Sequence, residues 1–182
     1  VEEKGVEYHG VDISRKELEL ARKACPAGDF QLATMRNLPF EDETFDVIFH
    51  IASLHHLLTK QERLEALGEA YRVLKPGGTF HLTVMGLFQM KFWRLFVKKA
   101  QGKATLPEPM KKSVKFFDVF LPWSWESGKK VQRYYHAFRK GELKKLFKQG
   151  PLTEISITFI KNGKVVPFYK AKNIVVHAKK AV

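Results

Sequence analysis

The sequence predicts an α/β protein built on a mostly parallel sheet, and three observations support this fold class. Short apolar runs alternate with amphipathic stretches of helical spacing over residues 6–85. Two of the helical stretches begin with the Ser/Thr-x-x-Glu pattern of a capping box. The Asn162-Gly163 dipeptide between two β-rich runs predicts a hairpin, so we expect the sheet to finish with antiparallel strands.

The first predicted unit is a strand, a helix and a second strand. Residues 6–14 (VEYHGVDIS) form a short β-rich run that ends near Asp12. Ser14 and Glu17 then form a capping box at the start of a helix. Residues 29–35 (DFQLATM) alternate as a half-buried strand does. Asp12 therefore stands at the carboxyl end of a strand, where it can bind a ribose or simply cap the next helix.

The second predicted unit repeats this order. Residues 45–54 (FDVIFHIASL) form a continuous apolar run, which predicts a strand covered on both faces. Thr59 and Glu62 form a second capping box, which opens a helix over residues 59–74. The KPGG sequence ends that helix, and residues 79–85 (TFHLTVM) are the next predicted strand. Later in the chain, GELKKLFKQG predicts a short helix with Leu143, Leu146 and Phe147 inward.

Positive charge is concentrated in residues 87–150. The whole chain has a formal net charge of +13, and this segment holds 16 Lys and Arg against 4 Asp and Glu. It also holds 13 of the 23 aromatic residues. Attraction to phosphates together with stacking on bases is one reason for such a segment, and a solvated lysine face over an ordinary aromatic core is the other. We interpret the chain as one domain, residues 1–182, with 87–150 as a basic aromatic substrate-binding insertion.

The remaining composition limits the class of protein. The apolar fraction of 45% is that of a globular domain, and no apolar run reaches the roughly 18–20 residues that span a bilayer. Cys25 is the single cysteine and is expected to be buried filler, so no internal disulfide can form and a reducing cytoplasm is the expected compartment. Adjacent histidines, His55 and His56, point apart on regular backbone, and no zinc-ligand spacing is present, so no metal site is expected.

Four motifs together resemble the class I S-adenosylmethionine-dependent methyltransferases. They are HGVDIS, RNLPFEDETFDVIF, LHHL and EAYRVLKPGG, which occur in this order over residues 6–85. The resemblance implies a Rossmann-like sheet and S-adenosylmethionine as the cofactor. It places Asp12 on the cofactor ribose, Thr34 and Met35 beside the adenine, and the end of the 45–54 strand near the sulfonium. The implied cofactor-binding residues are Asp12, Ile13, Thr34, Met35, His50 and Ile51.

Two departures from that family change the expectation. The family usually has an aspartate at the position of Thr34, so the contact to the adenine amino group should be weaker here. The family's glycine-rich loop is missing, which implies a sheet that lacks its first strand and helix. The 182 residues are then expected to bind the cofactor poorly, to be inactive alone and to expose a sheet edge.

A second resemblance concerns residues 121–143 (LPWSWESGKKVQRYYHAFRKGEL). This run is similar to the C-terminal signature of the tRNA wobble-uridine methyltransferases that esterify 5-carboxymethyluridine. The resemblance implies the anticodon loop of tRNA as the substrate. It also implies a partner, since these enzymes commonly work with a small zinc-binding activator subunit. The implied substrate-binding residues are His55, His56, Arg133, Tyr134, Tyr135, His136 and Arg139.

The chemistry of ester formation fits these residue types. A carboxylate of ordinary pKa is already ionised at pH 7, so no general base and no catalytic residue beyond positioning groups is expected. We expect Arg133 and Arg139 to bind the carboxylate or a nearby phosphate. Tyr134, Tyr135 and His136 are expected to hold the extruded base, although Tyr134 and Phe138 also have the spacing of a helix start.

Two other functions stay open on the sequence. One is a class I methyltransferase for a small or lipid-soluble acceptor, with the basic insertion as a lid or membrane contact. The other is a non-catalytic RNA-binding module. Residues 92–99 have the pattern of an amphipathic helix that suits a lid, an RNA face or a partner surface.

Overall fold

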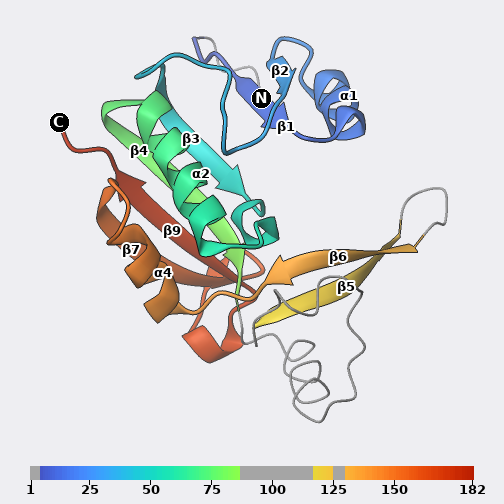
Figure 1. The fold of residues 1–182 in the computed structure, drawn as a ribbon, viewed down its shortest axis with the longest axis vertical. Coiled ribbons are helices and arrows are strands. Elements are labelled where there is room, and N and C mark those ends of the chain that lie inside the picture. Colours follow the sequence, from blue (N-terminus) through green and yellow to red (C-terminus); the bar gives the residue numbers. More distant parts are fainter. Residues whose placement is uncertain (1–4, 87–116, 125–129) are drawn as a thin grey trace.

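The computed structural model describes residues 5–86, 117–124 and 130–182. Within these ranges the strands form three sheets: a parallel pair near the N-terminus, a five-stranded mixed sheet, and a two-stranded hairpin that extends from it (Figure 1). The amphipathic helix predicted over residues 92–99 lies outside the described residues. None of the described helices is both long and apolar enough to cross a membrane.

The first predicted unit is confirmed. Strand β1 (His9–Asp12) and strand β2 (Asp29–Leu32) pair in parallel, and helix α1 (Arg15–Ala24) connects them. The Ser14 side chain caps α1 by accepting a hydrogen bond from the Glu17 backbone N–H at 3.4 Å. The second strand is shorter than predicted: it ends at Leu32, whereas the prediction extended it to residue 35.

The five-stranded sheet has the order β3-β4-β9-β7-β8. The first two strands are parallel, and β9 lies antiparallel between β4 and β7. Asn162 and Gly163 both have positive φ, at 51° and 75°, and form the turn of the predicted hairpin. The antiparallel end of the sheet is therefore confirmed. The strands are β3 (Phe45–Ile51), β4 (Leu74–Met85), β7 (Thr153–Lys161), β8 (Lys164–Val165) and β9 (Asn173–Lys179).

Two helices bury their apolar sides in the main core. Helix α2 (Lys60–Val73) starts at the predicted capping box, in which Thr59 and Glu62 bond each other's backbone N–H. Helix α4 (Lys140–Phe147) buries the three inward residues predicted for it. Leu67 of α2, Phe80 of β4 and Phe147 of α4 are all almost fully buried in this core. The sequence pattern of both helices is thus satisfied by packing on the sheet.

The prediction that both faces of β3 are covered is wrong. Val47, Phe49 and Ile51 are 45%, 60% and 60% exposed, whereas His50 is buried. Strand β3 is the last strand of its sheet and pairs with β4 alone among the described strands. Its side chains alternate between the helix-covered core and a face that the described residues leave open. Among the described strands, β3 thus forms one edge of its sheet.

The two-stranded hairpin carries the RYYH sequence. Strand β5 (Asp118–Ser124) pairs antiparallel with strand β6 (Lys130–His136), and Asp118 lies opposite His136. Tyr134 is consequently a strand residue, and α4 starts only at Lys140. The alternative that Tyr134 and Phe138 open a helix is wrong.

Candidate active site

The carboxyl end of β3 meets strand β6 through a short 3-10 turn, η1 (Leu54–His56). Ala52, with a φ of +51°, turns the chain out of β3 toward η1. The Nδ1 atom of His56 lies 2.8 Å from the carbonyl oxygen of Tyr134. Because a carbonyl only accepts hydrogen bonds, this ring nitrogen carries the proton. The hydrogen bond joins β6 to the turn that follows β3.

The rings of His55, His56 and Tyr135 form one cluster at this junction. The two imidazoles contact each other, with ring centroids 4.4 Å apart, and both contact Tyr135, at 5.2 and 4.6 Å. The prediction that the histidines point apart is wrong, because a 3-10 turn carries them instead of a regular helix or strand. The backbone N–H of Met85 donates to Nδ1 of His55 at 3.2 Å, which leaves the proton of a neutral His55 on Nε2.

Arg133 supplies the fixed positive charge of the ring cluster. Burial, helped by repulsion from His56 and Arg133, lowers the pKa of His55 to about 3. Burial also lowers the pKa of His56. Both imidazoles are therefore neutral at pH 7. The guanidinium of Arg133, on an exposed residue, lies 6.0 Å from the centroid of the Tyr135 ring.

His136 lies in a buried ionic cluster beside these rings. Its Nδ1 is 2.5 Å from Asp118 Oδ1 and its Nε2 is 2.7 Å from Glu142 Oε1. Carboxylates accept only, so both ring nitrogens are donors and the ring is an imidazolium. Although burial opposes this charge, the hydrogen bonds to Asp118 and Glu142 raise the pKa of His136.

Arg63 of α2 completes this ionic cluster. Its guanidinium donates to the carbonyl of Leu57 at 2.8 Å and to the Tyr134 hydroxyl at 3.3 Å. It also lies 3.9 Å from Glu142. The cluster thus connects α2, β5, β6 and α4. The side chains of His136 and Tyr134, predicted to hold a base, lie inside it and are 3% and 8% exposed.

Sequence reasoning missed three members of this cluster: Asp118, Arg63 and Glu142. Asp118 is eighteen residues from His136, and no spacing rule connects a lone aspartate to a distant histidine. Arg63 has the appearance of an ordinary charged residue on an amphipathic helix. Glu142 lies in the GEL sequence of the run that resembles the tRNA enzymes. Its separation of six residues from His136 was the one sequence signal that could have linked the two side chains.

The predicted cofactor residues divide between surface and core. Asp12 Oδ1 accepts a hydrogen bond from the backbone N–H of Ser14 at 2.7 Å, and Ser14, not Asp12, is the residue that caps α1. Ile13 and Ile51 are 79% and 60% exposed. Thr34 Oγ1 accepts from the Arg36 N–H at 3.3 Å, and Met35 packs against the core.

His50 is the core member of this set. Its ring contacts Phe80, and burial lowers its pKa to about 4. Among the described residues its Nδ1 has no hydrogen-bond partner. A buried polar atom of this kind is costly unless another group satisfies it.

The surface residues fit the chemistry of a nucleoside cofactor. The Ser14 N–H takes one carboxylate oxygen of Asp12, which leaves Oδ2 for a ribose hydroxyl. Ile13 directly follows this carboxylate and offers an exposed apolar side chain to an adenine ring. Ile51 offers the same kind of surface at the carboxyl end of β3.

Known proteins resemble this chain in sequence and in fold. A family model described as "Methyltransferase domain" matches residues 1–82. Among solved structures, a SAM-dependent methyltransferase from Methanosarcina mazei aligns with a TM-score of 0.69 at 18% identity, over 96% of this chain and 82% of that one. A S-adenosylmethionine-dependent methyltransferase from Clostridium acetobutylicum gives 0.68 at 16%, over 97% and 76%. Together these matches support a class I S-adenosylmethionine-dependent methyltransferase, and S-adenosylmethionine is the cofactor of that class.

Curated methyltransferases with related sequences include two kinds of tRNA enzyme. "Probable tRNA methyltransferase 9B" of Homo sapiens is 41% identical over 116 residues, which is 63% of this methyltransferase and 20% of the human protein. "tRNA (carboxymethyluridine(34)-5-O)-methyltransferase" of Schizosaccharomyces pombe is 28% identical over 134 residues, or 71% of this chain and 58% of that protein. The chain thus spans about a fifth to three fifths of the length of these two relatives.

Proposed function

We propose that this methyltransferase modifies tRNA by esterifying the carboxymethyl group of a wobble uridine. The observation that carries the proposal is the hydrogen bond between His56 and Tyr134, which brings Arg133 and Tyr135 to the carboxyl end of β3. The names of the tRNA methyltransferase relatives support it. In this proposal, Asp12 holds the ribose of the cofactor, and Ile13, Thr34 and Met35 lie around its adenine. His50 and Ile51 lie toward its sulfonium.

When bound, S-adenosylmethionine supplies an electrophilic methyl carbon, and an ionised carboxylate needs no base to attack it. The residues of the chain therefore act by holding the acceptor in place and keeping water out. Arg133 attracts the carboxylate, and Tyr135, which is 7% exposed, supports Arg133 from behind by packing on His55 and His56. The neutral rings of His55 and His56 line the site without adding a charge that would weaken the nucleophile. Arg139 binds a phosphate, and the ionic cluster of His136 with Tyr134 fixes the position of β6.

A small-molecule acceptor is the second candidate, and one comparison favours it. The "27-O-demethylrifamycin SV methyltransferase" of Amycolatopsis mediterranei is 35% identical over 79 residues, 40% of this chain and 28% of that protein. A match of that length can fit within residues 1–82, where the family model also lies. The 134-residue match to the fission-yeast tRNA enzyme must extend far beyond residue 82. This difference in extent is why we prefer tRNA.

Two further expectations accompany the proposal. A small zinc-binding activator subunit is the expected partner, and the cytoplasm is the expected location. The first comes from the resemblance of residues 121–143 to the tRNA family, and the second from the single cysteine, Cys25.

Mass spectrometry of tRNA nucleosides tests the function directly. Cells that lack the gene should accumulate 5-carboxymethyluridine at the wobble position and lose its methyl ester. An unchanged nucleoside profile would refute the proposal. Binding of an anticodon stem-loop should also weaken steeply with salt, because several phosphates are neutralised. An affinity for the stem-loop that does not change with salt concentration, or the absence of binding, favours the small-molecule acceptor.

A further inference from the structure

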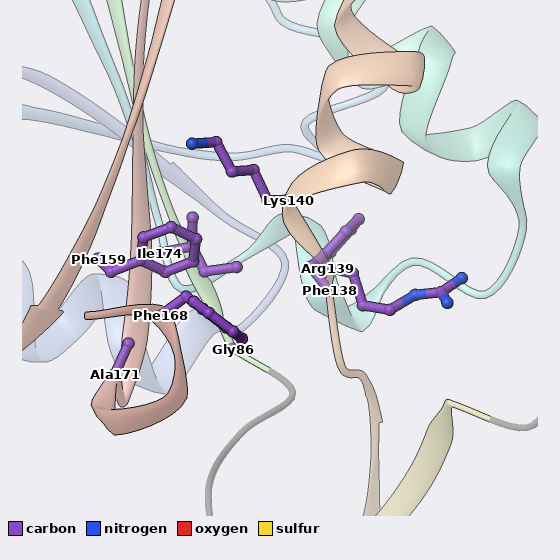
Figure 2. A pocket seen from close by; sticks show the side chains of 8 residues that line it. All are labelled: Gly86, Phe138, Arg139, Lys140, Phe159, Phe168, Ala171 and Ile174. Carbon is purple, nitrogen blue, oxygen red and sulfur yellow. The ribbon is translucent and has the colours of Figure 1, made fainter.

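A cavity of about 160 Å³ lies where β4 ends, outside the ring cluster of His55, His56 and Tyr135 (Figure 2). Gly86, the residue after β4, lines it and donates its N–H to the carbonyl of Lys172 at 3.1 Å. The preceding residue, Met85, touches both regions. Its N–H bonds His55 in the ring cluster, and its carbonyl accepts from the N–H of Phe138, which lines the cavity. The cavity and the candidate active site are therefore neighbours.

The walls of this cavity are flat and apolar. Phe138 and Ile174 are buried, while Phe159 is half-buried and Phe168 is 50% exposed. The rings of Phe159 and Phe168 have centroids 6.3 Å apart. A single water needs roughly 10–15 Å³ of such space, so this cavity has room for a ring-sized group. An aromatic lining of this kind suits a planar ring that stacks.

Two cations border these aromatic walls. Lys140 is exposed, and its Nζ lies 5.8 Å from the centroid of the Phe159 ring. Arg139 is also exposed, and Figure 2 shows its side chain directed away from Phe159 and Phe168. Its guanidinium lies 4.1 Å from the centroid of the ring of Phe117, the residue just before β5. An apolar cavity that is lined by aromatic rings and bordered by cations complements a ligand in which a planar ring is joined to an anion.

We propose that this cavity receives an unstacked base of the RNA substrate from a nucleotide next to the one that is methylated. Phe168 stacks on the base, Phe159, whose ring is tilted by 60° from that of Phe168, contacts the edge of the base, and Lys140 binds its phosphate. This inference rests on the proposed function, because it takes RNA as the substrate class. A lipid phosphate would match the same charge, but the short ring-lined cavity suits a flat ring better than an acyl chain.

Two pairs of variants test the cavity. Phe168→Ala removes a stacking ring from the cavity, and Tyr169→Ala removes an equally exposed ring that does not line it. Lys140→Ala removes the cation, and Lys144→Ala removes an exposed lysine elsewhere on α4. Fluorescence anisotropy with a labelled anticodon stem-loop measures binding, and thermal unfolding checks that each variant folds. All four side chains are exposed, so the fold should persist.

We expect Phe168→Ala to weaken stem-loop binding about tenfold, the effect of losing one stacked base. Lys140→Ala should lower the slope of log affinity against log salt by about one. Tyr169→Ala and Lys144→Ala should change the affinity less than twofold.

The outcomes separate this inference from the proposed function. If the unmodified chain binds the stem-loop and Phe168→Ala binds it equally well, the cavity assignment is overturned and the tRNA proposal stands. If the unmodified chain does not bind the stem-loop at all, the tRNA proposal is overturned and the cavity assignment with it. If Phe168→Ala instead abolishes binding to anionic phospholipid vesicles, the ligand is a lipid and the base assignment is wrong.

Discussion

The Nδ1 atom of His56 donates a hydrogen bond of 2.8 Å to the carbonyl oxygen of Tyr134, a residue 78 positions later in the chain. This bond fixes strand β6 against the turn that follows β3. The ring of His56 also packs on Tyr135, so one side chain sets both the position of the strand and the surface beside Arg133.

We therefore expect His56→Phe to lower methyl transfer to the stem-loop while cofactor binding changes little. The phenyl ring keeps the packing on Tyr135 but cannot donate to Tyr134, which costs about 1 kcal/mol of unfolding free energy. His56→Asn is the matched rescue, because its amide nitrogen can take the place of Nδ1. Single-turnover kinetics with both variants check this, and equal activities would contradict it.

The buried ionic cluster predicts a large loss of stability in His136→Ala. The change removes the imidazolium that bonds two carboxylates, Glu142 and the buried Asp118, which is 2% exposed. Breaking a buried pair in this way costs about 3–5 kcal/mol. Urea unfolding measures it, with the exposed Lys144→Ala as the control for α4. A loss below 1 kcal/mol would mean that Asp118 finds water or another partner.

Acid should destabilise the protein through two buried neutral histidines. Burial lowers the pKa of His50 to about 4 and that of His55 to about 3, whereas both titrate near 6.5 when the chain unfolds. The unfolded state thus binds more protons, so the unfolding free energy falls as the pH drops from 6.5 toward 4. Urea midpoints between pH 7 and 4 should decrease, and His50→Leu should flatten the curve.

His136 contributes with the opposite sign. Its pKa is raised in the folded state, so its stabilisation is complete below pH 6.5 and is lost as the pH rises through the folded pKa. Glu142→Gln removes one of its two carboxylates and should shift this loss to lower pH. Titration of the His136 ring by NMR measures the shift directly. An unaltered titration in the variant would show that Glu142 does not hold the charge.

Asp12→Asn should separate the two functions of this residue. The amide oxygen still accepts from the Ser14 N–H, so the turn before α1 is kept, but the carboxylate for the ribose is lost. We expect affinity for S-adenosylhomocysteine, measured by calorimetry, to fall at least tenfold without loss of helix by circular dichroism. Asp12→Ala should lose the bond to Ser14 as well as the carboxylate. If Asp12→Asn binds as well as the native chain, Asp12 serves only to hold the Ser14 N–H.

Arg133→Ala should lower ester formation on the stem-loop about ten- to hundredfold. Arg133 is exposed on β6, and a charge-assisted contact of about 1.5–3 kcal/mol corresponds to a ten- to hundredfold change. Lys145→Ala, an exposed cation on α4, is the control for net charge. Methylation assays with labelled cofactor distinguish the two variants.

Local patterns in the sequence predicted most of the described elements. The Thr59 and Glu62 capping box and the Asn162-Gly163 turn depend only on neighbouring residues, and the structure has both. The coverage of β3 was wrong because a continuous apolar run does not reveal which faces other segments cover. A sheet face is covered or open according to distant parts of the chain.

The candidate site could be predicted only in part for the same reason. The RYYH sequence pointed to the correct region, but its alternation as a strand sends Tyr134 and His136 into the core and leaves Arg133 outside. If the segment had been assigned as a strand, its alternation would have placed Arg133 on the opposite side from Tyr134 and His136. The partners Asp118 and Arg63 come from other elements and could be found only in three dimensions.

The edge of β3, which no other described strand covers, has a practical meaning for every measurement above. Its backbone groups stand beside the exposed side chains of Phe49 and Ile51, a combination that favours pairing with another strand. Self-association through this edge would compete with ligand binding at high protein concentration. Ligand affinities should consequently be measured at low protein concentration.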